Sequence, residues 1–260
     1  MSVNGYTYAN KMLNLPDEYK VSGMPNGNQR IYEGKDIYRW EMRQFAGLDE
    51  KGNSLWYMDR DLTDGEGNVV GVEKVTTGDA TEATQYLLEK SALPDFTGGL
   101  NTTLRWKSLD LTIMTNFQFG GYGYDYDFSA FSSANFPMNR LKNYADAWNP
   151  ETGKGSAPIW NTNDSNINAS SDRFLISKTY FNLRNITLGY TFPANWMSKI
   201  GIKSVRVYFA CDNVFFASKR KGYDPRTSMG GQGATVALNS VDGTYYSPIR
   251  TTSVGLNINF

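Results

Sequence analysis

Hydrophobic and polar residues alternate at period two over several long stretches of the chain. Such alternation is typical of β-strands whose two faces meet different surroundings. The last residues, TTSVGLNINF, carry the pattern to the final position. The pattern predicts six strands, at Asp36–Ala46, Thr97–Lys107, Leu109–Phe119, Tyr180–Phe192, Ser204–Phe215 and Thr251–Phe260.

Two local features of the pattern predict how the strands pair. The turn at Lys107 and Ser108 is so short that the strands on either side of it should form an antiparallel hairpin. In Tyr180–Phe192 the hydrophobic phase slips from odd to even positions. Because a slip of one residue exchanges the two faces of a strand, we expect a β-bulge near Arg184 and Asn185.

The predicted connections are short at one end of the strands and long at the other. The short ones are Lys107–Ser108 and Pro193–Lys203, and the long ones are Gly47–Phe96, Gly120–Thr179 and Ala217–Ser247. The long connections are polar and rich in Gly, Asn and Asp. Short turns on one side and long loops on the other are typical of outer-membrane β-barrels. The second long loop also holds a predicted short helix, Arg140–Trp148, which Asn149 and Pro150 would end.

Composition removes several classes of function. The 26 basic and 26 acidic residues balance, so no excess of positive charge favours nucleic acid. The chain has no histidine, which excludes a Ser-His-Asp triad and any zinc site that uses His. Its single cysteine excludes an internal disulfide. No apolar run reaches the length of a membrane-spanning helix, and the N-terminal segment does not resemble a signal peptide.

Several motifs of the chain occur in the order in which a known family has them. The C-terminal half resembles the end of SusC/RagA-type TonB-dependent receptors of Bacteroidetes. The matching stretches are LPDFTGGLNTTLRWKSLDLTIMTNFQFGG, YFNLRNITLGYTFP, IKSVRVYFACDNVFF, GYDPR and SPIRTTSVGLNINF. The earlier segments NKMLNL and YEGKDIYRWEMRQFAGLDEKGNSLWY also resemble this family, so the resemblance covers essentially the whole chain. The shared order makes it specific, whereas any one motif would be weak.

This resemblance implies an all-β fold. Residues 1–260 would form the C-terminal part of an antiparallel transmembrane β-barrel, with about six of its roughly 22 strands and with long extracellular loops. The signal peptide and plug domain of such receptors would be absent from the sequence. The intact receptor would import glycans or peptides through the outer membrane, with no enzymatic activity and no cofactor. The implied partners are a SusD-like lipoprotein, the TonB complex, the barrel-assembly machinery and outer-membrane lipid, but no nucleic acid.

The resemblance also implies roles for individual strand residues. In such receptors the barrel-assembly machinery reads a final strand that ends on an aromatic residue, and the matching residues are Val254, Leu256, Ile258 and Phe260. Alternation in a barrel wall assigns one face to the lumen and the other to lipid. The lumen-facing candidates are Asn101, Thr103, Arg105, Asp110, Thr112, Asn116, Gln118, Arg206 and Asp212. The lipid-facing candidates are Leu104, Trp106, Leu111, Ile113, Val207, Phe209, Leu256, Ile258 and Phe260.

Aromatic residues of the long loops are candidates for contact with a substrate or with the partner lipoprotein. The segment GGYGYDYDF interleaves Tyr122, Tyr124 and Tyr126 with Gly and Asp. Tyrosine rings can stack on sugars while carboxylates accept hydroxyl hydrogen bonds, although an ordinary aromatic strand end is the simpler interpretation. Trp148 and Trp160 lie in the same loop and are candidates for the same contacts.

The acidic segment DRDLTDGEGN has the composition of a calcium loop, with Asp59, Asp61 and Asp64 as possible ligands. An EF-hand loop would need Gly where the chain has Asp64 and Glu where it has Val70. A solvent-exposed acidic turn is therefore preferred to a calcium site.

A second class of protein stays open at this point. A secreted β-sandwich that binds carbohydrate would also account for the many Tyr, Asn and Gly residues, with the aromatic residues packed between two sheets. It predicts a soluble monomer and gives no reason for a chain that stops on Phe260.

Overall fold

The computed structural model describes residues 1–132, 142–160, 166–219 and 249–260. Five sequence predictions extend outside these ranges. They are the long connections Gly120–Thr179 and Ala217–Ser247, residues 140–141 of the predicted helix, the GYDPR motif at 222–226, and residues 247–248 of the last motif.

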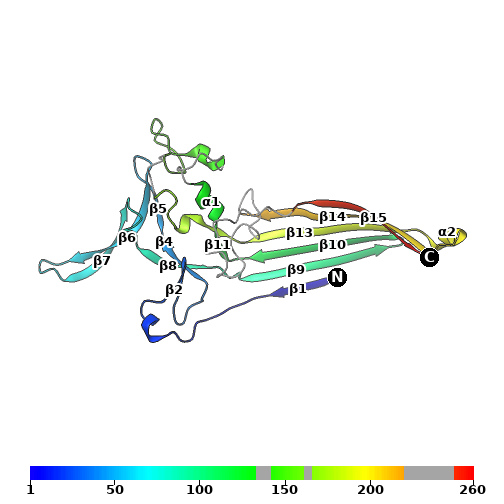
Figure 1. The fold of residues 1–260 in the computed structure, drawn as a ribbon, viewed down its shortest axis with the longest axis horizontal. Coiled ribbons are helices and arrows are strands. Elements are labelled where there is room, and N and C mark those ends of the chain that lie inside the picture. Colours follow the sequence, from blue (N-terminus) through cyan, green and yellow to red (C-terminus); the bar gives the residue numbers. More distant parts are fainter. Residues whose placement is uncertain (133–141, 161–165, 220–248) are drawn as a thin grey trace.

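A long six-stranded sheet forms one end of the elongated molecule (Figure 1). Each strand pairs antiparallel with its neighbours. From the second strand onward the spatial order follows the chain, and five of the six predicted strands are confirmed with nearly the predicted bounds. In spatial order the strands are β1 (Ser2–Tyr6), β9 (Phe96–Trp106), β10 (Leu109–Phe119), β13 (Tyr180–Thr191), β14 (Ser204–Ser218) and β15 (Thr251–Asn259).

Both local features of the pattern are also confirmed. The turn at Lys107 and Ser108 joins β9 to β10, and Lys107 has a φ of 54°, a positive value that two-residue hairpin turns of type II′ have at their first central residue. The register of β10 against β13 shifts between Met114 and Thr115, and Arg184 is the residue of β13 left without a partner opposite it. Because this bulge absorbs one residue, the hydrophobic residues before and after it share one face of the sheet.

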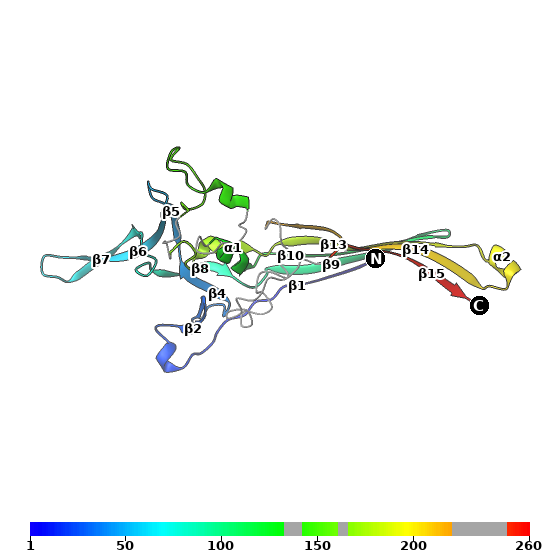
Figure 2. The same ribbon diagram turned by 45° about the horizontal axis from the view of Figure 1, so that its top comes forward.

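The two long connections before β13, which the sequence predicts as long polar loops, fold into small sheets. We call residues 7–95 and 120–179, where described, the loop layer; it extends to both sides of one end of the large sheet (Figure 2). Its strands form sheets of four, three and two strands. They are β2 (Met24–Asn26), β3 (Gln29–Ile31), β4 (Arg39–Arg43) and β8 (Gln85–Ser91); β5 (Phe45–Leu48), β6 (Ser54–Thr63) and β7 (Val69–Thr77); and β11 (Tyr122–Tyr124) and β12 (Leu175–Ser177).

The predicted strand Asp36–Ala46 is wrong as a strand of the large sheet. The segment divides into β4 and β5, which belong to two separate sheets of the loop layer. Trp40 and Met42 account for this, because only 6% and 2% of their surfaces are exposed, under aromatic residues that come from distant loops. The first strand of the large sheet is β1 instead, whose sequence SVNGY is too short for alternation to stand out.

Helices are few and short in the described residues. The helix predicted at Arg140–Trp148 appears as a 3₁₀ turn, η2 (Lys142–Asp146). Among the helices of the described ranges, none is long and apolar enough to cross a membrane. The others are α1 (Tyr126–Phe131), α2 (Ala194–Met197), η1 (Asp17–Tyr19), η3 (Asp172–Phe174) and η4 (Ser198–Ile200).

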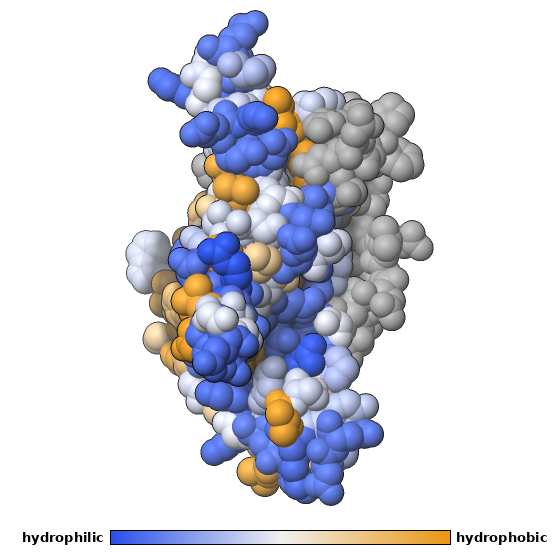
Figure 3. All heavy atoms as spheres, turned by 90° about the vertical axis from the view of Figure 1, so that its left-hand side faces the viewer, coloured by the Kyte–Doolittle hydropathy of each residue, from blue (hydrophilic) through white to orange (hydrophobic). Residues whose placement is uncertain are grey.

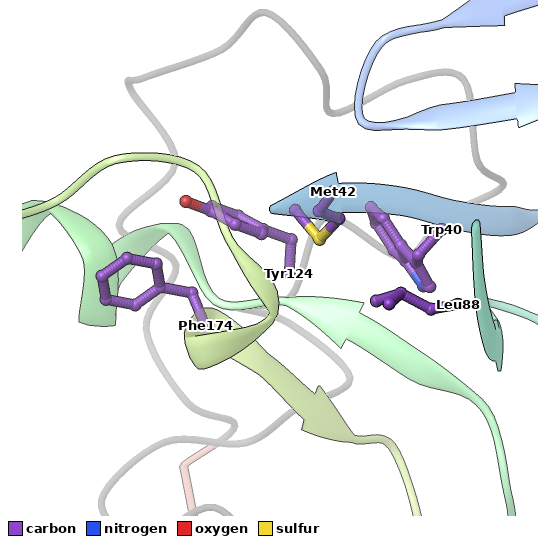
Figure 4. Packing of buried hydrophobic residues seen from close by; sticks show 5 residues of the cluster. All are labelled: Trp40, Met42, Leu88, Tyr124 and Phe174. Carbon is purple, nitrogen blue, oxygen red and sulfur yellow. The ribbon is translucent and has the colours of Figure 1, made fainter. Parts of the chain in front are cut away.

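The larger hydrophobic core lies in the loop layer (Figure 4). Within this core the indole N–H of Trp40 has a hydrogen-bond acceptor, since Trp40 Nε1 donates to the carbonyl oxygen of Tyr122 at 3.1 Å. A second, smaller cluster surrounds Trp56, which is 1% exposed. The buried members of the larger core are Trp40, Met42, Leu88, Tyr124 and Phe174.

Specific contacts attach the loop layer to the large sheet. The backbone N–H of Asp95 donates to the carbonyl oxygen of Phe119 at 2.9 Å. Gly120 follows with a φ of 74°, and a Cβ there would lie 2.0 Å from Asp95 Oδ2, so only glycine fits this turn. Gln118 Nε2 of β10 donates to the carbonyl oxygen of Lys178 at 3.3 Å. Lys178 Nζ in turn donates to the carbonyl oxygen of Ala92 at 3.3 Å, which links the two connections of the loop layer to each other. The loop layer is thus held at several points.

One face of the large sheet is apolar and lies open in the described structure. Leu104 and Leu256 are each 57% exposed, and Leu188 and Phe209 are each 47% exposed. A β-sandwich would bury these residues against a second sheet. The described ranges place no second sheet over this face, so the β-sandwich interpretation is wrong for this part of the chain.

The core of the loop layer gives a first prediction. Phe174→Ala should cost about 3–5 kcal/mol of local stability, because the ring is 1% exposed and packs edge-on against Tyr124 and Phe128. Hydrogen exchange at the amides of β11 and β12 would measure this loss. Phe119→Ala is the matched control, since that ring is 52% exposed and should cost much less. Equal protection in both variants would contradict this packing.

Candidate functional site

The register of the large sheet separates its side chains into an apolar and a polar face. Directly opposed residues share a face. One apolar row crosses five strands and consists of Leu104, Leu111, Leu188, Phe209 and Val254. The next consists of Trp106, Leu109, Tyr190, Val207 and Leu256.

All of the lumen-facing candidates lie on the opposite, polar face, by the same register. The structure adds four residues of β13, whose orientation the phase slip obscured in the sequence, and Tyr208 of β14, whose aromatic ring does not mark it as polar in the sequence. The predicted members are Asn101, Thr103, Arg105, Asp110, Thr112, Asn116, Gln118, Arg206 and Asp212, and the added ones are Tyr180, Asn182, Asn185, Thr187 and Tyr208.

An ion pair crosses one strand of this face. Arg206 of β14 donates from Nε to Asp110 Oδ1 at 2.9 Å and from Nη2 to Asp110 Oδ2 at 2.6 Å. Asp110 lies on β10, so the pair passes over β13, where the residue beneath it is Gly189. A Cβ on Gly189 would lie 2.3 Å from Arg206 Nη2 and 2.5 Å from Asp110 Oδ1. The glycine therefore opens the space in which this two-point pair forms.

Further hydrogen bonds between side chains continue along the polar face toward the loop layer. Asn182 Nδ2 donates to Asn116 Oδ1 at 2.8 Å, and Asn116 Nδ2 donates to the Tyr180 hydroxyl at 3.3 Å. Nearer the middle of the sheet, Asn185 Nδ2 donates to Asp212 Oδ1 at 2.8 Å. Each link joins neighbouring strands, so the face is a hydrogen-bonded ladder of amides, hydroxyls and carboxylates.

The chemistry of this face suits contact with polar solutes or water. Arg105 and Arg206 balance Asp110 and Asp212 in charge. The described residues contain no group of three or more Asp, Glu, Cys or His side chains placed to hold a metal ion. Amides and hydroxyls both donate and accept hydrogen bonds, so this face can be hydrated along its length.

The four residues expected to guide barrel assembly lie at or next to the free edge of the large sheet. Val254, Leu256 and Ile258 occupy the apolar face of β15, and Phe260 follows the end of that strand. Their exposed fractions are 75%, 57%, 40% and 78% respectively. A role in assembly remains a prediction.

The aromatic loop candidates have unequal access to solvent. Tyr124 is only 5% exposed and belongs to the loop-layer core, so it packs against other residues of this chain. Burial raises the pKa of the Tyr124 phenol, whose proton is donated to Ser129 Oγ at 3.2 Å. Tyr122 and Tyr126 are half-buried against the same core. Of the tryptophans, Trp148 is half-buried, whereas Trp160 is 49% exposed.

The acidic segment forms a hairpin rather than a calcium loop. Asp59 and Asp61 lie on the extended strand β6, which separates their carboxylates along the strand. Asp64 Oδ1 accepts hydrogen bonds from the backbone N–H groups of Glu66 and Asn68, both at 2.9 Å. Those bonds lower the pKa of the Asp64 carboxyl and use the oxygens that a metal would need. The three carboxylates do not converge.

The ion pair over Gly189 gives a second prediction. Gly189→Ala should displace Arg206 from Asp110 and cost about 1–3 kcal/mol, because the added methyl group occupies the space of both side chains. Urea unfolding of the folded protein in detergent would measure the cost. Gly71→Ala on β7 is the control, since the nearest atom to its Cβ is 3.8 Å away and no destabilisation is expected. A Gly189→Ala protein as stable as this control would contradict the account.

Known proteins share both the sequence pattern and the fold. No protein-family model matches the chain. It is 24% identical over 272 residues to TonB-dependent receptor P3 of Formosa agariphila, and the match covers 96% of this chain and 26% of that protein. It is 26% identical over 191 residues to TonB-dependent receptor SusC of Bacteroides thetaiotaomicron, covering 73% of this chain and 17% of that protein.

Solved structures show the same fold. The structure of the RagAB peptide importer in the open-open state matches with a TM-score of 0.74 and 22% identity, over 99% of this chain and 26% of that chain. The structure of the RagAB peptide transporter matches with a TM-score of 0.69 and 24% identity, over 92% of this chain and 24% of that chain. The chain spans about a quarter of the length of the first of these relatives. In both sequence and fold, this chain is similar to a segment of a SusC/RagA-type TonB-dependent receptor.

Proposed function

We propose that the chain is the C-terminal part of the barrel wall of an outer-membrane importer. The observation that carries this proposal is the division of the large sheet into an exposed apolar face and a hydrogen-bonded polar face. A wall between lipid and an aqueous lumen needs this arrangement, because alternate residues of each strand meet different solvents. The names of the relatives, which are receptors and not enzymes, support transport rather than catalysis.

The apolar face is the proposed lipid contact. Leu104, Leu188, Phe209 and Leu256 are each close to half exposed. In water such a continuous apolar surface would be an aggregation hazard, whereas lipid tails solvate it without cost. Aromatic residues lie near the strand ends, with Trp106 68% exposed beside the short turns, as interfacial rings do in membrane barrels.

The polar face is the proposed lumen wall. Its amide and hydroxyl ladder would contact water, a plug domain or a passing solute without binding any of them strongly. The four charged candidates cancel, so this part of the wall favours neither anions nor cations. Glycans and peptides are the substrate classes that the family implies.

The loop layer is the proposed extracellular surface. It lies at the end of the sheet opposite the short turns and α2 (Figure 1). Seen from that end, the molecule is mostly hydrophilic with scattered hydrophobic patches (Figure 3). We propose that a SusD-like lipoprotein caps this surface and that the TonB complex supplies energy to the intact receptor. Trp160 and the half-buried Tyr122 and Tyr126 remain candidate contacts there.

A third prediction tests which face meets lipid. Ile113→Arg and Ile186→Arg should each cost about 2–4 kcal/mol in the folded barrel, because these two residues pair near the middle of β10 and β13 on the apolar face, where a charge loses its hydration. Thr112→Arg, on the polar face next to Ile113, is the matched control and should cost little. Reversible urea unfolding into lipid vesicles would measure the three values. Equal tolerance of all three substitutions would overturn the assignment of the faces.

A fourth prediction tests import. Cells that carry the full-length gene should take up labelled oligosaccharides or peptides larger than porins admit, and a protonophore should abolish that uptake because TonB transmits the energy of the proton gradient. A strain in which the gene is deleted is the control. Uptake that persists at the same rate in the deletion strain for every solute tested would contradict the proposal.

A further inference from the structure

A polar cluster in the loop layer surrounds the amine of Lys74 on β7. Lys74 Nζ lies 4.3 Å from the ring centroid of Tyr57 and 4.4 Å from that of Tyr86. It also donates a hydrogen bond to Gln44 Oε1 at 2.7 Å. No ion pair to Lys74 is found within the described ranges. Two aromatic faces and one amide oxygen therefore hold this ammonium group.

The backbone fixes the two rings relative to one another. Tyr57 lies on β6 and Tyr86 on β8, which belong to different sheets. The N–H of Thr84 donates to the carbonyl oxygen of Tyr57 at 3.2 Å, and the N–H of Asp59 donates to Thr84 Oγ1 at 2.8 Å. These bonds connect the two sheets beside the cluster, so we expect the two rings to keep their positions when Lys74 is substituted or its side chain moves away.

The electrostatics of the cluster favour a cation. The Tyr86 hydroxyl donates to Asp59 Oδ1 at 2.5 Å. Burial, and then the bond to Asp59, raise the pKa of Tyr86 to about 12, so the phenol stays protonated at neutral pH. The faces of aromatic rings carry negative potential and attract ammonium groups. The Asp59 carboxylate adds negative potential nearby.

The cluster is also open to solvent. Lys74 is exposed, and Tyr57 and Tyr86 are half-buried. Lysine loses considerable side-chain entropy when its long stem is held in one place. Because holding Lys74 between the rings costs this entropy, a ligand that carries an ammonium group could displace the Lys74 side chain from them.

We propose that Tyr57, Tyr86 and Gln44 form a binding seat for a primary ammonium group of an extracellular substrate, with Lys74 as its internal competitor. This inference rests on the proposed function, because that function places the loop layer outside the cell. The hydrogen bond to Gln44 Oε1 requires an N–H donor, so a primary ammonium fits better than a quaternary one. The lysine side chain of a peptide has this chemistry.

The test compares two peptides on the full-length receptor in detergent micelles. The probes are acetyl-Ala-Lys-Ala-amide and its norleucine counterpart, which lacks the ammonium group. In Lys74→Ala, the lysine peptide should bind roughly tenfold more tightly than the norleucine peptide, as two cation–π contacts and one hydrogen bond would give. The lysine peptide should also bind this variant more tightly than the wild type. Calorimetric titration would measure the dissociation constants.

Two further variants make the test specific. Tyr86→Leu in the Lys74→Ala background should remove the preference for the lysine peptide. Lys90→Ala is the matched control, because Lys90 Nζ lies over a single ring, that of Tyr122, at 5.4 Å, and its removal should leave binding at the wild-type level. If Lys74→Ala does not fold, Lys74→Thr suits the strand and gives the same comparison.

Equal affinity for the two peptides in the Lys74 variant, or an equal gain in Lys90→Ala, would overturn the inference. Because the readout is binding in micelles, that result would leave the import proposal standing if energised uptake is still observed. Loss of energised uptake with the lysine preference intact would instead refute the import proposal and leave the seat in place.

Discussion

The hydrogen-bond register of the six-stranded antiparallel sheet is the constraint on which the rest of the structure depends. The register decides which residues of neighbouring strands lie opposite each other, and this alignment places apolar side chains from β9 to β15 in continuous rows. A slip of one residue would turn a strand over and mix leucines with asparagines. The bulge at Arg184 is the device that preserves the register where the sequence of β13 changes phase.

The same register explains where small residues occur on the sheet. Arg206 reaches Asp110 only because Gly189 lies beneath the pair. Tyr208 likewise lies over Gly255, where a Cβ would be 2.2 Å from the ring. Glycine in a strand normally weakens it, since it adds backbone entropy and no packing. Here it opens space that neighbouring side chains fill, so the polar face is built from pairs of large and small residues.

The buried hydrophobic clusters lie in the loop layer and not in the large sheet. The large sheet leaves its apolar face open, whereas the loop layer contains buried aromatic clusters around Phe174 and Trp56. A barrel wall needs no core of its own, because lipid solvates one side of it. The connections at one end hold their shape with small sheets, tight glycine turns and a conventional hydrophobic core. The proposed ammonium seat lies where two of those sheets meet.

The sequence by itself determined the strands of the large sheet from β9 to β15, the hairpin turn and the bulge, because period-two alternation and turn length are local properties. It also separated the polar candidates on β9, β10 and β14 from the apolar ones. Only the tertiary structure decided where Trp40 and Tyr124 lie, because both are buried in the loop-layer core by residues distant in the chain. Cross-strand partners such as Arg206 and Asp110, and Lys74 with Tyr86, are far apart in the chain, and no local pattern encodes which distant residues a folded sheet brings together.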